Sequence, residues 1–527
     1  MIEVREAHES DVDRIREIFF LTYGRAYAHP EYYDPQQLKR MMFDDNTLLL
    51  VAEDTDNNAI LGTASVLLEV GSHEDLLGEF GRLAVDPQGR NRGIGRRLME
   101  GRLERICDRL HVGIVDNRVA HPYSQKISLE HQFVPVGFLP LKFLLDRRES
   151  LSVHVRHFGE ALTLRRNNPR IIPETHRLAE LALHNCNLPA DVIVDDQANP
   201  YPHETFRLDE LQTQGYATLL RFERGRVKNR EIFGPMRLHY GLFKLRARHS
   251  NYLLACDGEE VIGGLGFTLD EVERAARIFE LVTIDETPVR FLLQSLGEKC
   301  EERGVEYIEV DVSAYAPRMQ RTLLELNYLP AAYVPAMVFY DIERLDAIRM
   351  VRLLVPPDTG KVELIPEGQP IADAVMRNFS RRNVLPKIGR ALPRIKLFAG
   401  LTDEQRNRLA SLCGVQDFEP GEKILTEGEI GRKTYLILNG EVRINVGSRP
   451  RDVGTVGVGE SLGEMSLLSG SPYAATATAQ SHIETAVLDH PSFNELIRLR
   501  PDIAVVIYRN FADDVAQKLR WLTKNDR

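Results

Sequence analysis

Residues Leu83 to Met99 read Leu-Ala-Val-Asp-Pro-Gln-Gly-Arg-Asn-Arg-Gly-Ile-Gly-Arg-Arg-Leu-Met. The apolar start of this stretch is typical of a β-strand, and the pattern breaks at Pro87. A turn with two glycines follows, and apolar residues then recur at helical spacing, namely Leu98, Leu103 and Ile106. The stretch therefore predicts a strand, a glycine-containing loop and the start of a helix.

The loop between the predicted strand and helix is suited to hold a phosphate. Glycine tolerates positive φ and lets a ligand approach the main chain closely, so that main-chain N–H groups can point into the loop. The unpaired N–H groups of the first helical turn and the positive end of the helix dipole also favour an anion. A Gly-x-Gly pair alone is not specific, because many strand-to-helix turns use glycine only to turn.

The pattern Arg90-x-x-Gly93-x-Gly95, directly after a strand that ends in Val85-Asp86-Pro87, resembles the pyrophosphate loop of the GNAT acyltransferases. The resemblance implies that this loop holds acetyl-CoA. Main-chain amides around Leu83 to Val85 would then orient the thioester and the pantetheine arm, and those from Arg90 to Gly95 would hold the pyrophosphate. The predicted acetyl-CoA-binding residues are Leu83, Val85, Arg90, Asn91, Arg92, Gly93, Ile94, Gly95 and Ser124.

Size and composition limit the possible classes of protein. A chain of 527 residues predicts three or four domains. The net charge of −10 argues against nucleic acid as the main partner, and no apolar run approaches the roughly 18 residues of a membrane helix. Residues 1–7 have neither a basic start nor an apolar core, which predicts no secretory signal. Five scattered cysteines, none in a Cys-x-x-Cys pair, predict a reducing cytoplasm with neither a disulfide framework nor a metal site; they are Cys107, Cys186, Cys256, Cys300 and Cys413.

Residues 1–165 are expected to form one α+β domain. Strands are predicted at residues 2–4, 48–53, 61–69 and 112–115, and helices after Ser10 and near residues 123–131. This order predicts a mainly antiparallel sheet with flanking helices, which is an α+β pattern, and the resemblance to the GNAT enzymes implies their mixed-sheet fold. The order also resembles the GNAT family element by element.

Residues 166–350 look like a second, diverged GNAT-like copy. Tyr252 to Gly264 reads as a β-hairpin with its turn at Asp257-Gly258, and a strand and a helix follow. No Arg-x-x-Gly-x-Gly occurs here, and Asp285 and Glu286 would repel a pyrophosphate. We expect this copy not to bind coenzyme A and to act as a structural or substrate-shaping partner.

Residues 351–392 are expected to be a connector. Prolines and basic residues alternate there with apolar positions, which predicts a partly helical linker with a solvated face. A basic helix on a membrane surface is the alternative.

Glu79 is the candidate general base of the first domain. An acyl transfer to an amine needs a base, an oxyanion donor and a proton for the leaving thiolate. Many relatives place a carboxylate on the strand that leads into the loop. Strand alternation would put Glu79, Gly81, Leu83 and Val85 on one face, from which Glu79 would reach the substrate. An exposed charge at the start of the strand is the alternative.

The candidate general acid lies in the segment from His121 to Phe133. GNAT enzymes usually carry Asn, a small residue and then Tyr ahead of Gly-Phe, with the tyrosine as the acid. Matching Gln132-Phe133 to Gly-Phe places Ser128 at the tyrosine, Ser124 at the small residue and His121 at the asparagine. The usual acid is therefore absent, and Ser128, His121 or an ordered water would replace it. His121 is alternatively a helix-start residue bonded to the main chain.

Residues 393–527 are expected to form a small β-barrel or jelly roll with flanking helices. Thr402 is a predicted helix N-cap, and short strands separated by glycine turns follow at regular spacing. The segment resembles a cyclic-nucleotide-binding domain. Its candidate nucleotide-binding residues are Gly463, Glu464, Met465, Ser466, Tyr473 and Ala474.

The nucleotide site departs from the family pattern at one pair. The family uses Arg-Ser or Arg-Thr to neutralise the cyclic phosphate, and this chain has Tyr473-Ala474. A lost charge-assisted contact of about 1.5 to 3 kcal/mol weakens binding roughly tenfold to a hundredfold or more. Ordinary recognition of cyclic AMP or GMP is therefore doubtful, and a packing, dimerising or altered-ligand module is the alternative.

The whole pattern predicts an acetyl-CoA-dependent N-acetyltransferase with a regulatory C-terminal domain. The amine acceptor is a protein lysine, as the resemblance to nucleotide-regulated lysine acetyltransferases implies, or a small molecule. The alternative is a sensor or scaffold that binds coenzyme A or nucleotide without turnover. A homodimer is left open.

Overall fold

The computed structural model describes residues 1–527 except 26, 28, 69–74, 212–230, 235–249, 393–394, 411, 448–450 and 526–527. These residues form two compact units, Met1–Met376 and Arg377–Arg527. The boundary lies inside the predicted connector, and one helix, α10 (Gln369–Ala391), runs through it. The predicted borders at residues 165 and 350 fall inside the first unit and stay predictions.

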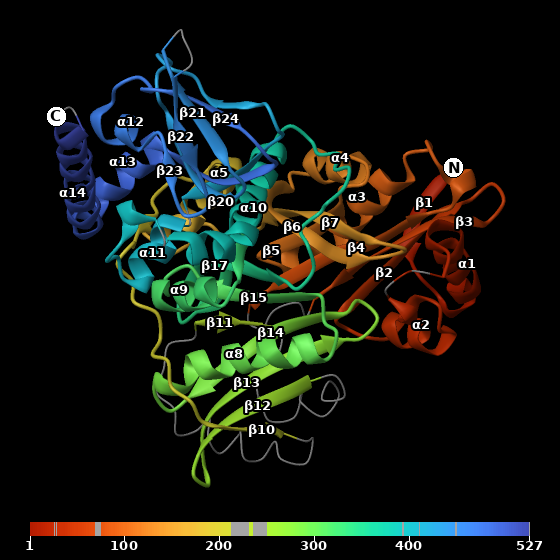
Figure 1. Cartoon of the computed structure of the whole chain (residues 1–527). Helices are drawn as coiled ribbons and strands as arrows, with labels where there is room; N and C mark the ends of the chain where they lie inside the picture. The colour runs from red at the N-terminus through yellow and green to blue at the C-terminus, as the bar shows by residue number, and fades with distance from the viewer. Residues whose placement is uncertain are drawn as a thin grey trace. The chain divides into compact units, whose positions relative to one another are not determined.

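One large mixed sheet forms the centre of the first unit (Figure 1). Its strands follow the order β1-β2-β3-β4-β5-β7-β6-β16-β17-β15-β14-β13-β12-β10. We call β1 to β7 the first half of the sheet and β10 to β17 the second half. The bounds in the first half are β1 Ile2–Glu6, β2 Thr47–Asp54, β3 Ala59–Leu67, β4 Leu77–Val85, β5 Val112–Arg118, β6 Val134–Leu144 and β7 Arg148–His157.

The two halves meet at the β6–β16 pair and have the same strand order when each is read outward from it. The first half then reads β6-β7-β5-β4-β3-β2-β1, and the second half reads β16-β17-β15-β14-β13-β12-β10. Its strands are β10 Arg207–Leu211, β11 Ile232–Phe233, β12 Ser250–Asp257, β13 Glu260–Asp270, β14 Ala275–Thr283, β15 Tyr307–Ser313, β16 Leu329–Tyr340 and β17 Glu343–Leu353. In each half one pair is parallel, β4–β5 and β14–β15, and the other neighbours are antiparallel. The predicted hairpin at Asp257-Gly258 is confirmed as the β12–β13 connection.

Helices cover both faces of the sheet. The helices of the first unit are α1 Val12–Tyr23, α2 Pro35–Met42, α3 Ile94–Ile106, α4 Tyr123–Glu130, α5 Pro173–Asn185, α8 Thr287–Glu302 and α9 Pro317–Glu325. Alternate residues of β2 pack on opposite faces: Leu49 and Val51 join the core with α1 and α2, while Leu50 and Ala52 join the core with α3. The short strands β8 (Arg170–Ile171) and β9 (Ile193–Val194) pair separately.

Short 3-10 helices complete the described first unit. They are η1 Glu9–Asp11, η2 Pro30–Tyr32, η4 Pro87–Gly89 and η5 Cys107–Arg109. The one that matters for the site is η4, which lies between β4 and α3.

The second unit contains two antiparallel four-stranded sheets and helices. The first sheet has the order β18-β25-β20-β23, with bounds Cys413–Phe418, Ile483–Asp489, Lys433–Asn439 and Ser461–Leu462. The second has the order β19-β24-β21-β22, with bounds Lys423–Leu425, Thr476–Ala479, Val442–Val446 and Arg451–Val456. The remaining elements are η9 Lys396–Phe398, α11 Asp403–Ala410, α12 Glu464–Ser469, α13 His490–Leu499 and α14 Pro501–Asn525.

A capping contact at the start of α11 confirms the prediction for Thr402. Its hydroxyl accepts a hydrogen bond from the Gln405 N–H at 3.3 Å, and the Gln405 carboxamide accepts one from the Thr402 N–H at 2.9 Å. Among the described residues, no helix is long and apolar enough to cross a membrane, and no group of His, Cys, Asp or Glu is arranged to hold a metal ion.

Candidate functional site

The predicted glycine loop lies between β4 and α3. Asp86 fixes its start, because the buried carboxylate accepts from the Gln88 N–H at 2.6 Å and pairs with Arg14 of α1. Gly93 is the N-cap of α3 with φ of +72°, a left-handed conformation that favours glycine. The loop is therefore held at its base and led into the helix by a residue that sequence analysis singled out.

The tip of this loop is open. Residues 90–93 are exposed, and a Cβ added to Gly93 would meet nothing within 4 Å. No other described residue accepts a hydrogen bond from the main-chain N–H groups of residues 91–95. Gly95 instead packs closely, because a Cβ there would lie 3.1 Å from Ile127 of α4 and 3.5 Å from Leu83. The loop thus presents unpaired donors beside a close-packed helix start, which fits a diphosphate.

Strands β4 and β5 diverge next to this loop. They pair in parallel from Leu77↔Val112 to Glu79↔Ile114, and both strands continue beyond that pair. Because β4 beyond Glu79 has no partner in β5, its outer edge is left available to a ligand.

A β-bulge in β4 overturns the predicted alternation. Gly81 pairs with Ser65 and Ala84 with Thr63, so that Arg82 and Leu83 together face one residue of β3. Arg82 has φ of +52°. The prediction that Glu79, Leu83 and Val85 share a face was wrong, because the extra residue inverts the alternation: Leu83 and Val85 pack toward α3, on the opposite face from Glu79.

A buried arginine of α3 holds the bulge. The Arg102 guanidinium donates to the main-chain oxygens of Ser65 at 3.2 Å and Gly81 at 3.3 Å, one on each strand. Burial lowers its pKa to about 9. Sequence analysis missed Arg102, although an arginine within the apolar stripe of a helix is a signal of such a buried role.

Glu79 is ionised at neutral pH and pairs with Arg82. Burial raises the pKa of the Glu79 carboxyl, but the positive charges of Arg82 and Lys142 outweigh it and leave that pKa below its usual value. Since 29% of the side chain is exposed, a ligand can reach it. A carboxylate with a lowered pKa is a weak base, which suits proton transfer through a water molecule.

The three candidate residues near α4 differ in their surroundings. Ser128 is buried and bonded to Asn117 of β5, with the Asn117 Nδ2 3.1 Å from the Ser128 hydroxyl oxygen. The Oγ of Ser124 and the Nδ1 of His121 are buried and have no hydrogen-bond partner among the described residues. Tyr123 is 69% exposed and lies beside His121, with ring centroids 5.2 Å apart. Two buried polar atoms therefore lack a partner among the described residues, one on a predicted coenzyme-binding residue and one on a candidate proton donor.

The candidate nucleotide residues lie around the short helix α12. Gly463 is its N-cap with φ of +81°, and Ser466 donates to the Ser471 main-chain oxygen at 2.6 Å. Met465 is half exposed and Ala474 is exposed. The Tyr473 ring packs between Gly463 and Gly431: a Cβ on either glycine would lie 3.0 Å from its Cε1 atom.

Two hydrogen bonds hold Tyr473 in this position. Its hydroxyl donates to the Lys433 main-chain oxygen at 2.8 Å and accepts from the Lys433 N–H at 3.2 Å. The ring also packs against the core between the two sheets. An aromatic side chain, and not a guanidinium, therefore lies against the start of α12, a consequence that sequence analysis did not anticipate.

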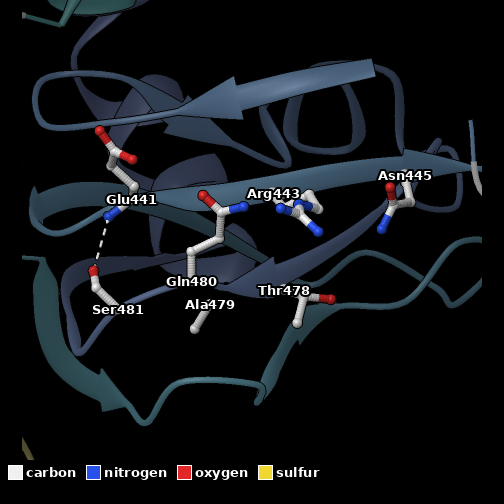
Figure 2. Close-up of a pocket in the computed structure, with 7 residues that line it drawn as sticks. All are labelled: Glu441, Arg443, Asn445, Thr478, Ala479, Gln480 and Ser481. Atoms are coloured by element: carbon white, nitrogen blue, oxygen red, sulfur yellow. Dashed lines mark hydrogen bonds between the residues drawn. The ribbon is translucent and has the colours of Figure 1, made fainter. Parts of the chain in front are cut away.

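The second unit also contains a pocket of about 720 Å³, which is lined by residues other than the candidate nucleotide residues (Figure 2). Arg443 and Asn445 of β21 line it with Thr478 of β24, and Gln480 lies beside Arg443. Because Val442 is buried in the core and Ile444 packs against it, the alternate side chains of Arg443 and Asn445 face outward. None of the six candidate nucleotide residues lines this pocket.

Two segments of the chain match known protein families. Residues 45–126 match the family described as "Acetyltransferase (GNAT) domain", and residues 415–500 match "Cyclic nucleotide-binding domain". The chain thus contains a GNAT acetyltransferase domain and a C-terminal cyclic nucleotide-binding domain.

Relatives and solved structures match only part of the chain. It is 33% identical over 106 residues to the cAMP-dependent protein kinase regulatory subunit of Yarrowia lipolytica, covering 20% of this chain and 28% of the relative. It is 32% identical over 127 residues to the Cyclic AMP receptor protein of Thermus thermophilus, covering 24% and 57%. The solved catabolite activator protein of Thermus thermophilus is 29% identical with a TM-score of 0.23, covering 25% and 61%. The chain spans less than a third of the length of the kinase relatives.

Proposed function

We propose that residues 1–165 bind acetyl-CoA and transfer its acetyl group to an amine, and that residues 393–527 regulate this reaction. Residues 166–350 would be a second GNAT-like domain that does not bind coenzyme A, joined to the regulatory domain by residues 351–392. The observation that carries the proposal is the open loop around Gly93, with its unpaired main-chain N–H groups beside the diverging strands β4 and β5. The family match to residues 45–126 supports it.

The residues of the loop suit a diphosphate in shape and charge. Leu83, Val85 and the main chain from Arg90 to Gly95 would hold the coenzyme, and the unpartnered Ser124 hydroxyl would be a further contact. Asn91 and Gly93 both have positive φ, which turns successive N–H groups toward one side. Arg92 is already paired with Asp54 at 2.7 Å, whereas Arg90 is exposed and available to a phosphate oxygen.

The proposed reaction is a nucleophilic acyl transfer. The neutral amine nitrogen attacks the thioester carbonyl carbon, an N–C bond forms, the C–S bond breaks, and the electron pair of that bond leaves with the sulfur. The amine loses one proton, which Glu79 accepts directly or through water, and the thiolate takes up one proton. The His121 imidazole and the Ser128 hydroxyl are the candidate proton donors, and the position of His121 Nδ1, buried without a partner, favours His121.

An acceptor screen tests the proposed activity. The full chain is incubated with radiolabelled acetyl-CoA and panels of free amines and lysine-containing proteins, with and without cyclic AMP or cyclic GMP. We expect label in an amide product. Binding of acetyl-CoA without any labelled acceptor would favour the alternative of a sensor or scaffold, for which the absence of the usual tyrosine acid speaks. No binding of acetyl-CoA would overturn both.

The regulatory domain is proposed to bind ordinary cyclic nucleotides weakly. The Tyr473 ring lies against Gly463 at the start of α12, and the resemblance to cyclic-nucleotide-binding domains implies that a cyclic phosphate would bind at this helix start. The variant Tyr473→Arg with Ala474→Ser is expected to bind cyclic AMP or GMP about tenfold to a hundredfold more tightly than the unmodified chain, since it regains a charge-assisted contact.

Calorimetry on the full chain measures this difference, and Tyr508→Arg on the exposed part of α14 is the matched control for the added charge. Saturable micromolar binding by the unmodified chain would contradict the weak-binding proposal. Equal affinity in both chains would show that Tyr473 does not obstruct the site.

A further inference from the structure

Equivalent positions in the two halves of the sheet carry different charges. Strands β4 and β14 are both nine residues long, and strands β5 and β15 are both seven. The parallel pairs Leu77↔Val112 and Ala275↔Tyr307 start each ladder at the first residue of both strands. Glu79 is therefore equivalent to Arg277, and Asp116 of β5 is equivalent to Asp311 of β15.

In the second half, the equivalent aspartate is fully paired. Asp311 accepts from Arg277 at 2.9 Å, and Arg349 of β17 donates to both of its oxygens at 2.8 and 3.0 Å. Arg277 also lies 3.7 Å from Glu309. The Asp311 carboxylate is therefore paired with two arginines.

In the first half, the aspartate lacks the donor that its counterpart has. Glu79 stands where Arg277 stands in the second half, and a carboxylate cannot donate. The only ion pair of Asp116 among the described residues is with Lys142 of β6, 3.3 Å from its Oδ2. Its Oδ1 is buried and has no hydrogen-bond partner among them. A buried carboxylate oxygen without a donor costs free energy, so a donor from a ligand is favoured there.

The second half of the sheet holds Lys142 in place. The Lys142 ammonium lies 3.1 Å from Glu309, which is 7% exposed and belongs to β15. Burial raises the pKa of the Glu309 carboxyl, but Lys142, Arg349 and Arg277 outweigh it and hold that pKa at about 2. The Lys142 ammonium therefore pairs with two carboxylates, Asp116 in the first half and Glu309 in the second half. One positive charge is thus shared between two negative charges.

Asp116 also lies where a substrate of the proposed reaction would enter. Ile114 is the last residue of β5 that pairs with β4, opposite Glu79, and Asp116 is two residues further, about 7 Å along the strand. Alternation places Ile114 and Asp116 on the same face of β5. Lys142 acts electrostatically on both Glu79 and Asp116, which is consistent with one shared space.

We propose that Asp116 binds the cationic amino group of the acceptor, and that Lys142 and Glu309 position Asp116 for this contact. The inference rests on the proposed acetyltransferase function and narrows its substrate class to aliphatic amines that arrive as ammonium ions. The ammonium donates to Asp116 Oδ1, as Arg277 donates to Asp311 in the second half. Before attack it gives up one proton, which Glu79 passes through water to the solvent, so that Glu79 is ionised again when the attacking amine loses its second proton. Asp116 is a specificity-determining residue, and Glu309 is a positioning residue that acts through Lys142.

The test compares a charged and an uncharged amine at pH 7.5. The probes are Nα-acetyl-lysine amide, whose side chain is an ammonium at this pH, and 4-methoxyaniline, which is neutral. Steady-state kinetics are measured with the full chain, with Asp116→Asn and with Glu309→Gln. The matched control is Glu302→Gln, which removes a carboxylate from an exposed ion pair on α8.

Asp116→Asn is expected to raise KM for the lysine derivative at least tenfold, with a smaller change for 4-methoxyaniline and unchanged affinity for acetyl-CoA. Glu309→Gln is expected to raise the same KM severalfold, and its thermal unfolding is recorded because Glu309 is buried. Glu302→Gln should leave all values unchanged.

The outcomes separate the two proposals. An unchanged ratio of kcat/KM for the two amines in Asp116→Asn would overturn this inference and leave the proposed function intact. A chain that binds acetyl-CoA but acetylates only the neutral amine, or neither probe, would also overturn it. A chain that does not bind acetyl-CoA would overturn the proposed function itself.

Discussion

Glu79 and Arg277 occupy the same place in two strands of equal length, yet one pairs with a neighbour on its own strand and the other with acidic residues of the next strand. The helices that follow these two strands, α3 and α8, also differ at their first turns. α3 begins after Gly93 with open N–H groups, whereas α8 begins after Asp285 and Glu286, with the Asp285 carboxylate accepting from the Thr287 N–H. The two halves therefore share a strand order and differ in the few residues that decide what each can bind.

This difference shows that the sheet sets positions and that the local residues set chemistry. A bulge interrupts the strand before the helix in both halves. In the first half the bulge carries Arg82, which pairs with the ionised Glu79. In the second half the buried Glu280 accepts from the Tyr252 hydroxyl at 3.0 Å, and this contact is sealed from solvent.

The largest expected effect is the loss of acetyl-CoA binding in Gly93→Glu. A carboxylate there would repel a diphosphate and block at least two charge-assisted contacts, so we expect affinity to fall at least about a hundredfold. Gly304→Glu is the matched control in the second half, because Gly304 also has positive φ and open space around it. Calorimetry on the unmodified chain should give one site per chain. Two acetyl-CoA sites per chain, or an affinity for acetyl-CoA in Gly93→Glu equal to that of the unmodified chain, would contradict the proposed difference between the halves.

The next effect concerns the base. Glu79→Gln is expected to lower kcat about a hundredfold while the affinity for acetyl-CoA stays the same, since the loss of a positioned base has this order of magnitude. The pKa of Glu79 lies below the usual 4.5, so the carboxylate stays ionised as pH falls to that value. The titration of Glu79 should therefore cause no change in the rate between pH 5 and pH 8.

Steady-state rates between pH 4 and pH 9 measure this profile, with Glu302→Gln as the control. A further ionisation near neutral pH that disappears in Glu79→Gln would show that the pKa of Glu79 is raised, and would exclude the charge balance described above.

The smallest effect is on stability in acid. The folded-state pKa of Glu309 is about 2, below its unfolded value near 4.5, so its contribution to the free energy of unfolding is complete above pH 4.5 and is lost as pH falls toward 2. Between pH 5 and pH 3 the loss is about 2 kcal/mol, at about 1.4 kcal/mol per pKa unit. Denaturant unfolding of the full chain and of Glu309→Gln measures it, and equal pH dependence in both would show that the ion pairs between the halves do not stabilise the fold.

The elements around the site were predictable wherever a short pattern suffices. The strand, the turn and the helix from Leu83 to Met99 follow from residue spacing and from two glycines, one of which has positive φ. The Thr402 cap and the turn at Asp257-Gly258 are local in the same way. The roles of Glu79, His121 and Ser128 stay predictions, because proton transfer depends on a bound substrate.

Other features could not be predicted from a pattern. The bulge at Arg82 inverts the alternation on which the prediction for Leu83 and Val85 rested. Arg102 was missed because its partners are main-chain oxygens of two strands. Neither contact leaves a repeat in the sequence that periodicity can detect.

The sequence by itself determined the glycine loop, the change of periodicity on either side of it and the loss of the basic residue at Tyr473, because each depends on backbone preferences or residue identity within a few positions. Only the tertiary structure decided that Lys142 lies between Asp116 and Glu309, and that Tyr473 packs between Gly431 and Gly463. Lys142 and Glu309 are 167 positions apart in the chain, and ion pairing and packing act through space, so their outcome is fixed only when the strands have paired.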